Sequence, residues 1–480
     1  MSLKTFRGGA HPPGRKDASK NAQIEYFSSP KQVVIHLNQH TGAPNQPLVK
    51  VGDSVRRGQK IASSDGKLMI PHHASICGVV RKIEPRPQSN LLDGVAIVIE
   101  ADGGTETEFL PALDVFSCTR EEAVARIREA GIVGMGGAGF PAWMKLSPPA
   151  SKPIGIVIAN GAECEPYLTI DYRTCLESPG ALVFGMAATL HVLGVKKGVF
   201  AVEDNKTDVV PVLEKAVGEF LAGEGSGKGF DISVQLLKTK YPQGGEKMLI
   251  EAITGRQVPS GGLPMDVGAV VQNLGTLKAI AEAFREGKPL IDRGFTVTGG
   301  ACKTPKNLCV PVGTVLSELI PDVIDVRADL ARVLYGGPMM GVSVPTLDTP
   351  IQKNTSGVVF MTPGEARVFD EGTCIRCGRC MRYCNCRLSP ALMNEALLSE
   401  DYAAADAIGL LDCIECGTCS YVCPARVRLV QRFRVGKMKL RAMKAAEQAR
   451  VKARAEAQAA AEAASAAVAS PASPASKEAK

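Results

Sequence analysis

The chain has no long apolar run and no leader-like start. None of its apolar stretches approaches the roughly 20 residues that a helix needs to cross a bilayer. Its opening, MSLKTFRGGAHPPGRKDASK, has no apolar core of the signal-peptide type. We therefore expect a soluble protein, or one attached to a membrane from one side only. Without an export pattern, the 15 cysteines do not predict a disulfide framework, because clustered thiols in a reducing compartment are more often metal ligands.

Acidic residues are scarce near the C-terminus. Residues 426–454 hold 11 Lys or Arg and a single acid, Glu447, which gives this segment a charge of +10. Since the whole chain carries +7, the rest of it carries −3. Apolar residues recur here on one helical face: Leu429, Phe433, Gly436, Leu440 and Met443. Such a basic helix either lies on anionic lipid or an acidic partner, or docks on its own domain. The Ala-rich sequence that follows is expected to be helical at first and disordered after the Ser-Pro repeats.

Two runs of cysteines share the spacing C-x2-C-x2-C-x3-C. Three thiolates at this spacing can take three corners of an iron–sulfur cube from one loop, while the fourth ligates the other cluster in two-cluster ferredoxins. The sequence therefore predicts two [4Fe–4S] clusters in a ferredoxin-like module. The first would be held by Cys374, Cys377, Cys380 and Cys423, and the second by Cys413, Cys416, Cys419 and Cys384.

Zinc is the alternative metal, but it favours separated C-x2-C pairs and has no use for a third and fourth cysteine in each run. One departure from the ferredoxin pattern concerns the first run. Cys384 is followed by Asn385 instead of proline, and then by Cys386. Cys386 is either a spare thiol or the true fourth ligand.

A glycine-rich loop, GMGGAGF, begins at Gly134. It satisfies G-x-G-x-x-G, but a dinucleotide fingerprint needs a strand before the loop and a helix after it. Here a helical pattern comes first, with Ala123, Ile127 and Ala130 on one face and Gly131 as a helix stop, and a strand ending at Asn160 comes later. The classical Rossmann interpretation therefore fails. The loop can still bring backbone amides close to a planar ring or a phosphate.

Three more pieces place polar groups at the ends of expected elements. NGAECEPYLTIDYR puts Asn160, Glu163 and Glu165 at the carboxyl end of a strand, where ligands of α/β sheets usually bind. In YPQGGEK, Gly244, Gly245 and Glu246 open a helix, and in VVQNLG, Asn273 lies between an apolar run and a helix. Each piece alone could be a loop and a cap; four in succession predict a binding site.

These four pieces resemble the flavoprotein subunit of respiratory complex I, over about residues 119–286. The resemblance implies an α/β domain that binds FMN and NADH, and it implies flavin contacts from this set: Gly134, Gly136, Gly137, Gly139, Phe140, Lys145, Asn160, Glu163, Glu165, Gly245, Glu246 and Asn273. Two positions depart from the family. Ala162 stands where the family has an aspartate, and Gly245 stands where it has a glutamate.

The twin cysteine runs do not match that flavoprotein, which has a single C-terminal cluster. A flavin domain followed by two ferredoxin-type runs resembles the RnfC component of the Rnf electron-transport complex, and the opening FRGGAHPP is similar to that family's start. The implied fold is α/β and multidomain. The expected parts are an extension (1–30), a barrel-sandwich-hybrid scaffold (31–118), the FMN/NADH domain (119–290), a β-grasp SLBB-like module (291–350), the two-cluster domain (365–432), and the basic helix with its Ala-rich tail (433–480).

The resemblance implies an NADH-linked electron-input subunit, with no catalytic acid, base or nucleophile of its own. Electrons would pass between NADH, FMN, two [4Fe–4S] clusters and ferredoxin or flavodoxin, while membrane partner subunits move ions. The chain would lie on the cytoplasmic face of the bacterial inner membrane. Two other interpretations remain: a soluble cobalamin reductase of microcompartment type, and an electron-relay or docking subunit that has lost its flavin.

Overall fold

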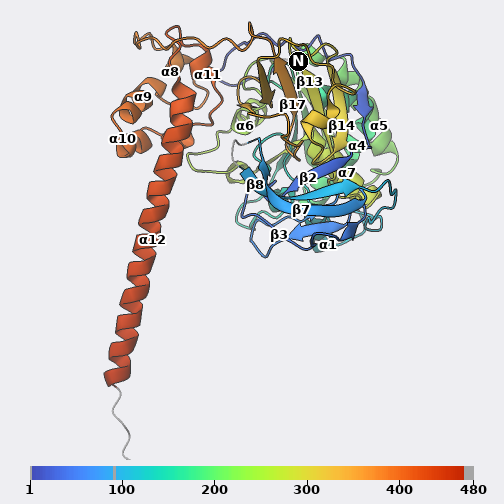
Figure 1. The fold of residues 1–480 in the computed structure, drawn as a ribbon, viewed down its shortest axis with the longest axis horizontal. Helices are drawn as coiled ribbons and strands as arrows, with labels where there is room; N and C mark the ends of the chain where they lie inside the picture. The colour runs from blue at the N-terminus through green and yellow to red at the C-terminus, as the bar shows by residue number, and fades with distance from the viewer. Residues whose placement is uncertain (1–2, 90–92, 470–480) are drawn as a thin grey trace, which may run out of the picture. The chain divides into compact units, whose positions relative to one another are not determined.

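The computed structural model describes residues 3–89 and 93–469 (Figure 1). The expected disorder after the Ser-Pro repeats concerns residues 470–480, which lie outside the described residues. The chain divides into two compact units. The first comprises residues 1–370 together with 416–418, and the second comprises residues 371–415 and 419–480.

Near the N-terminus, two small antiparallel sheets enclose an apolar core. Val33, Ile61 and Ile97 are among its fully buried members. Burial of four consecutive residues in strand β2 shows that this strand is covered on both faces. The first sheet has the order β2 (Gln32–His36), β8 (Asp93–Ala101), β7 (Gly78–Pro87), β4 (Ser54–Val55), and the second has the order β3 (Gln46–Pro47), β5 (Lys60–Ser63), β6 (His72–His73).

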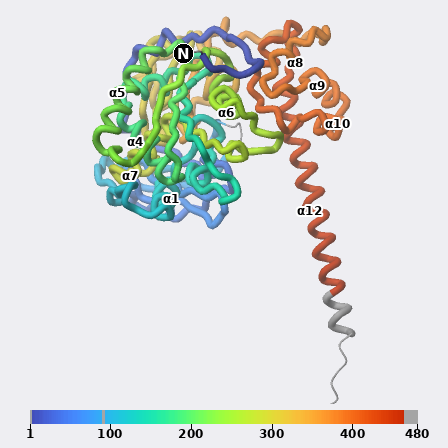
Figure 2. Tube along the Cα trace, turned by 180° about the vertical axis from the view of Figure 1, so that it is seen from behind, coloured from blue at the N-terminus to red at the C-terminus, as the bar shows by residue number. Residues whose placement is uncertain are grey.

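A four-stranded parallel sheet forms the centre of the next domain. Its order is β11 (Asp231–Leu237), β10 (Lys197–Glu203), β9 (Ile156–Gly161), β12 (Ala269–Asn273). Alternate residues of these strands enter two separate cores, as expected for a sheet that is covered on both faces. One core is shared with α1 (Arg120–Glu129), α4 (Pro179–Leu193), α5 (Val209–Ala222) and α7 (Leu274–Arg285), and the other with α6 (Glu246–Thr254) (Figure 2).

The predicted order of helix, glycine loop and strand is confirmed. Helix α1 buries Ala123 and Ile127, and its C-cap, Ala130, is buried as well. Gly131 follows the cap in the left-handed region, with φ +64°. The loop comes next, then α2 (Ala142–Lys145), and then β9. The expected helix starts at Glu246 and after Asn273 are also confirmed, since α6 begins at the first and Asn273 caps α7.

A six-stranded mixed sheet completes the first unit (Figure 1). Phe295, Val297 and Phe360 lie in its buried core. Strand β1 comes from the N-terminal extension and pairs in parallel with β14. The order is β1 (Ile24–Tyr26), β14 (Lys306–Pro311), β13 (Asp292–Thr298), β17 (Gly357–Met361), β15 (Arg332–Tyr335), β16 (Val342–Ser343).

No single helix of the described residues is long and apolar enough to cross a membrane. Only α3 (Ile170–Glu177) and α4 reach the required length and composition as a pair, and they are bent by 95° at their junction. Most side chains of α4 are buried in the core of the parallel sheet.

The second unit is helical. Its core gathers Met393, Ala405, Leu410 and Phe433. The helices in chain order are α8 (Arg379–Tyr383), α9 (Pro390–Leu398), α10 (Tyr402–Ala407), α11 (Thr418–Tyr421) and α12 (Leu429–Ala469). The first residue of α11, Thr418, is the last residue assigned to the first unit.

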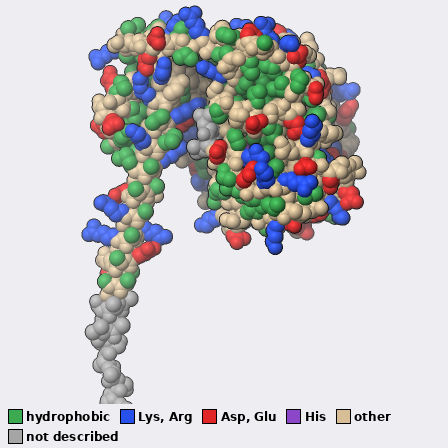
Figure 3. Space-filling model, in the orientation of Figure 1, with side chains coloured by type: hydrophobic (Ala, Val, Ile, Leu, Met, Phe, Trp, Pro, Cys, Tyr) green, Lys and Arg blue, Asp and Glu red, His purple; other side chains and the backbone are tan. Residues whose placement is uncertain are grey.

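Helix α12 docks on its own unit at its start only. Leu429, Phe433 and Leu440 are at most 5% exposed, whereas Met443 is 54% exposed, and from Arg441 to Glu462 every residue is exposed. Figure 3 shows Lys and Arg side chains standing out from this exposed part on more than one side. The apolar stripe expected from the sequence is therefore a packing face over its first four positions, and Met443 is not part of that face.

Two glycines in the left-handed region permit a test of close packing. Gly287 follows α7 with φ +67°, and a Cβ there would lie 1.5 Å from the carbonyl oxygen of Leu110. Gly194 follows α4 with φ +68°, and a Cβ there would meet no atom within 4 Å.

We expect Gly194→Ala to lower the free energy of unfolding by about 1 kcal/mol, the cost of the backbone conformation alone. Gly287→Ala should cost about 2 kcal/mol more. Urea unfolding followed by circular dichroism checks this, and equal losses would contradict the steric argument.

Candidate functional site

The carboxyl ends of β9 and β12 bring two asparagines together. Asn160 and Asn273 are partners in the parallel register. The Asn160 amide Nδ2 donates to the carbonyl of Gly244 at 2.8 Å, which ties the loop before α6 to the strand end. The Oδ1 of Asn273 accepts from Gly275 at 2.9 Å and caps α7. Two of the predicted pieces thus meet at one edge of the sheet.

The glycine loop folds beside Asn273. The Gly134 amide donates to the Phe140 carbonyl at 2.8 Å and closes the loop on itself. A Cβ on Gly136 would lie 3.1 Å from Nδ2 of Asn273, so this glycine allows the close approach. A Cβ on Gly137 would meet nothing within 4 Å, and residues 136–138 are exposed. The tip of the loop therefore presents bare backbone next to the strand ends.

The far end of the glycine loop is held by the N-terminal domain. Gly139 has φ +69°, and a Cβ on it would lie 3.2 Å from the carbonyl oxygen of Gln39. Thr41 donates its amide to the Gly139 carbonyl at 3.0 Å and its hydroxyl to the Ala138 carbonyl at 2.8 Å. This side of the loop is thereby fixed against the segment between β2 and β3.

Lys145 and Glu246 form an ion pair across the site. The Lys145 Nζ lies 2.8 Å from Oε1 of Glu246 and 3.0 Å from the Val271 carbonyl oxygen. The Lys145 and Glu246 side chains are 23% and 39% exposed, so both heads remain accessible. The structure thus brings together residues from the glycine-loop and Gly-Gly-Glu pieces.

Glu163 and Glu165 use their carboxylates to fold the chain. Glu163, at φ +43°, accepts from the amide of Asp171 at 2.7 Å, at the start of α3. Glu165 accepts from the amides of Met339 and Met340 at 3.1 and 2.8 Å. Burial raises the pKa of Glu165 to about 7, and those two amides oppose the rise. A flavin contact by either glutamate stays a prediction.

Two residues at this edge escaped the sequence reasoning. Asp171 accepts from Nδ2 of Asn273 at 2.8 Å, and burial followed by the nearby charge of Glu163 raises the pKa of Asp171 well above its ordinary value. Lys16 donates from one ammonium to the carbonyls of Glu163, Glu165 and Leu168. Neither role has a local signal, because Lys16 is about 150 residues from the carbonyls it binds and Asp171 is 102 residues from Asn273.

The residues at the sheet edge fit a flavin. Gln272 is 1% exposed, and neither its Nε2 nor its Oε1 has a hydrogen-bond partner among the described residues. A buried amide without partners is costly, and a ring with several polar atoms could satisfy it. The open backbone at Gly137 and the accessible head of Lys145 supply further donors beside it.

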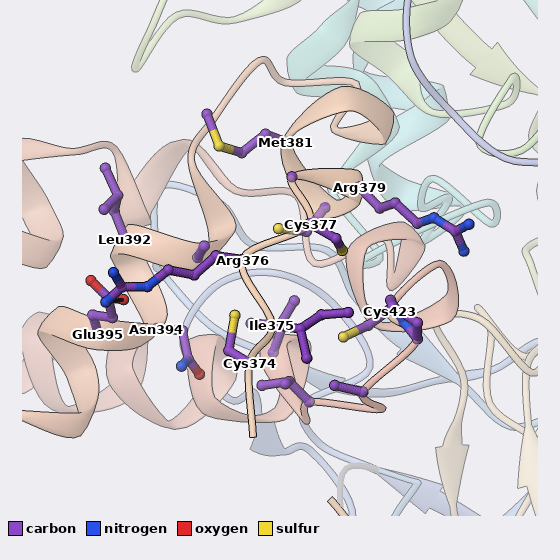
Figure 4. Close-up of a pocket in the computed structure, with 17 residues that line it drawn as sticks. Cys374, Ile375, Arg376, Cys377, Arg379, Met381, Leu392, Asn394, Glu395 and Cys423 are labelled. Carbon is purple, nitrogen blue, oxygen red and sulfur yellow. Dashed lines mark hydrogen bonds and ion pairs between the residues drawn. The ribbon is translucent and has the colours of Figure 1, made fainter. Parts of the chain in front are cut away.

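Four cysteines from two distant stretches line one cavity in the second unit. Its volume is about 360 Å³, and its wall includes Cys374, Cys377, Cys380 and Cys423. Figure 4 shows the sulfurs of Cys374, Cys377 and Cys423 around one space. The combination of three thiols from one run and the last thiol of the other is the set predicted for the first cluster. Four thiols around one hollow fit such a group, because thiolates are the usual ligands of iron–sulfur clusters.

The two cysteine runs repeat one backbone conformation. Arg376 and Glu415, each between the first and second cysteine of its run, have φ of +53° and +56°. Gly378 and Gly417, each after the second cysteine, have φ of +70° and +78°. Glycine is the residue that adopts this region without strain, which is why the tight turns expected beside the ligands can form.

The ligands predicted for the second cluster do not all belong to one unit. Cys384, Cys413 and Cys419 lie in the second unit, while Cys416 belongs to the segment 416–418 of the first. Their assembly around one cluster therefore stays a prediction. Within the second unit, the sulfur of Cys384 accepts from the amide of Leu388 at 3.4 Å, and the sulfur of Cys413 accepts from the amide of Glu415 at 3.4 Å.

None of the 15 cysteines forms a disulfide, and all of them lie in the described part of the chain. Among the residues that the structure describes, no three His, Cys, Asp or Glu side chains are placed to hold a single metal ion.

Comparison with known families gives three matches along the chain. The RnfC barrel sandwich hybrid domain matches residues 4–104, the Nuo51 FMN-binding domain matches residues 127–282, and a 4Fe–4S dicluster domain matches residues 366–452. The FMN-binding match includes the glycine loop, Asn160 and Asn273. The dicluster match includes all eight predicted cluster cysteines.

Similar proteins match nearly end to end. The C component of the proton-translocating ferredoxin:NAD(+) oxidoreductase complex of Clostridium ljungdahlii is 42% identical, over 93% of this chain and 96% of the relative. The C component of the Na(+)-translocating complex of Acetobacterium woodii is 39% identical, over 92% and 98%. The chain belongs to the RnfC family. The family resemblance and the multidomain α/β fold class predicted from the sequence are thereby confirmed, and this RnfC-family chain contains an FMN-binding domain and a 4Fe–4S dicluster domain.

Solved structures were compared as well. The NAD(+)-reducing [NiFe]-hydrogenase in its H2-reduced state aligns with a TM-score of 0.48 at 20% identity, over 68% of this chain and 65% of the other.

Cys384 and Cys386 are the two candidate fourth ligands, and the C-x2-C-x2-C-x3-C spacing favours Cys384. We expect Cys384→Ser to lose about half of the iron after anaerobic loading, because one cluster would lack a thiolate. Cys386→Ser should keep nearly all of it. Iron and sulfide analysis of the two variants checks this. The reverse pattern would make Cys386 the ligand.

Proposed function

We propose that this chain is the NADH-linked electron-input subunit of an Rnf-type membrane complex. It exchanges electrons with NADH through FMN and with ferredoxin through two [4Fe–4S] clusters, and the other subunits couple this flow to ion translocation. The chain acts from the cytoplasmic face of the membrane. One observation carries the proposal: an FMN-binding domain and a dicluster domain occur together in one chain of the RnfC family.

FMN, when bound, supplies the conversion of a hydride's electron pair into single electrons. The chain's own residues would bind and orient it. The exposed backbone of Gly136 and Gly137 would allow a planar ring to approach, and the amides of Gln272 and Asn273 would contact its polar atoms. The Lys145 ammonium, held by Glu246 and the Val271 carbonyl, would supply positive charge next to the ring.

The support beneath the flavin site consists of short hydrogen bonds between distant parts of the chain. Asn160 holds the turn before α6, and Asn273 holds both the start of α7 and the side chain of Asp171. Lys16 fixes the loop after β9 from the N-terminal extension. These bonds would keep the ring's surroundings rigid, which limits reorganisation as charge arrives and leaves.

Iron–sulfur clusters held by cysteine thiolates would carry the electrons onward. Cys374, Cys377, Cys380 and Cys423 would hold one cluster at the cavity of the second unit. Cys413, Cys416 and Cys419 with Cys384 would hold the other. No side chain is required as an acid, a base or a nucleophile, because the cofactors perform the redox chemistry.

The two alternative functions gain no support. The similar proteins are named as subunits of ferredoxin:NAD(+) oxidoreductase complexes and not as cobalamin reductases. A relay without flavin would not need the FMN-binding domain, which the family match covers from residue 127 to 282.

Anaerobic reconstitution tests the proposal. We expect about eight iron atoms, about eight sulfides and about one FMN per chain, because two cubes and one flavin would be bound. NADH should then bleach the flavin absorbance and reduce the clusters. A protein that binds zinc in preference to iron, or that takes up no FMN and oxidises no NADH, would overturn the proposal.

A substitution at Gly137 tests where the flavin lies. A Cβ at this position would meet no atom within 4 Å, so we expect the fold to be retained, while the valine side chain would take up space beside the strand ends. We expect Gly137→Val to weaken FMN binding by about tenfold or more, since one misplaced contact can cost about 1.4 kcal/mol or more. Gly180→Val, which also has open space at its Cβ, is the matched control. Fluorescence titration with FMN measures both, and equal affinities would place the flavin elsewhere.

A further inference from the structure

The surface beside Cys374 and Cys377 combines exposed thiols with exposed apolar side chains. Both cysteines are exposed, whereas Cys419 of the other run is only 8% exposed. Ile375 and Leu392, which line the same cavity, are 67% and 50% exposed. Met381, Arg376 and Arg379 also line the cavity (Figure 4), and Arg382 is an exposed residue of the same helix, α8, as Arg379 and Met381. These residues together are called the Arg379 face below.

The charge on this face is mainly positive, because Glu395 is the one acid in the cavity wall. From Thr373 to Asn394 the sequence has four arginines and no acid. The two acids that flank this stretch are both engaged: Glu371 pairs with Arg432 at 2.6 Å, and Glu395 pairs with Arg376 at 3.5 Å. Arg379 and Arg382 are exposed and form no ion pair among the described residues.

An apolar centre with a charged rim is the usual composition of a protein–protein interface. Arginine is enriched at such interfaces, and rim charges of one sign select a partner of the other sign and speed its approach. A cluster held by Cys374 and Cys377 would lie at the centre of this face, where it would come closest to a partner's own redox centre.

We propose that the Arg379 face docks an acidic iron–sulfur protein and is the place where single electrons pass between this chain and its redox partner. This inference rests on the proposed function, because it requires a cluster at Cys374. In each transfer one cluster is oxidised and the partner's cluster is reduced by the same electron, or the reverse, and no atom changes place.

The arginines are tested by binding. The full-length reconstituted chain is titrated with a purified acidic ferredoxin that carries two [4Fe–4S] clusters, at low and at high salt. Arg379→Gln/Arg382→Gln should bind about tenfold more weakly at low salt and should lose part of its salt dependence, because two rim charges are gone. The control, Arg441→Gln/Arg454→Gln, removes the same charge from the exposed part of α12 and should bind like the unaltered chain.

The apolar centre is tested on one helix. Leu392 and Leu398 are both exposed residues of α9, at 50% and 61%, but only Leu392 lines the cavity. Leu392→Gln should weaken ferredoxin binding severalfold without altering its salt dependence, and Leu398→Gln should leave it unchanged. Iron content, measured for every variant, shows that the cluster is retained.

The outcomes separate this inference from the proposed function. Loss of NADH oxidation with arginine-dependent ferredoxin binding would refute the proposed function and support the docking face. NADH oxidation with ferredoxin binding that is the same in all variants would overturn the docking face alone. Arginine-dependent binding to phosphatidylglycerol vesicles, with none to ferredoxin, would also overturn it, because the face would then contact lipid.

Discussion

The parallel pairing of β9 with β12 is the constraint on which the first unit's site depends. Parallel strands end at the same edge of a sheet, and their register places Asn160 opposite Asn273. Each asparagine then holds a separate loop: one fixes the turn at Gly244, and the other caps α7 and binds Asp171. A slip of one strand by one residue would turn its asparagine to the other face of the sheet and separate these loops.

Local patterns made much of this arrangement predictable. The face formed by Ala123 and Ile127, the stop at Gly131 and the cap at Asn273 all depend on nearby residues. The helix that ends before Gly131 and the later strand sufficed to reject a Rossmann loop. The paired cysteine runs are also local patterns, because thiols at such close spacing require a tight turn, which forms at Gly378. The resemblance to known families, which rested on the same motifs, supplied the domain order.

Long-range contacts could not be predicted in this way. Lys16 reaches carbonyls about 150 residues away, and nothing in its neighbourhood in the sequence marks it. The flavin contacts of Glu163 and Glu165 stay predictions, but a residue's type could not reveal that backbone amides engage these carboxylates. The apolar stripe on α12 includes Met443, but this residue is exposed and does not pack. Periodicity defines a helix face but not the point where the surface that it packs against ends.

The unequal burial of the two cysteine runs has a consequence for handling the protein. Cys374 and Cys377 face solvent, while Cys419 does not. Dissolved oxygen reaches exposed thiolates and their iron first, since oxidation follows accessibility. Brief contact with air should therefore degrade the two proposed clusters one after the other and leave a half-loaded species, whose colour and metal content would resemble those of a single-cluster protein.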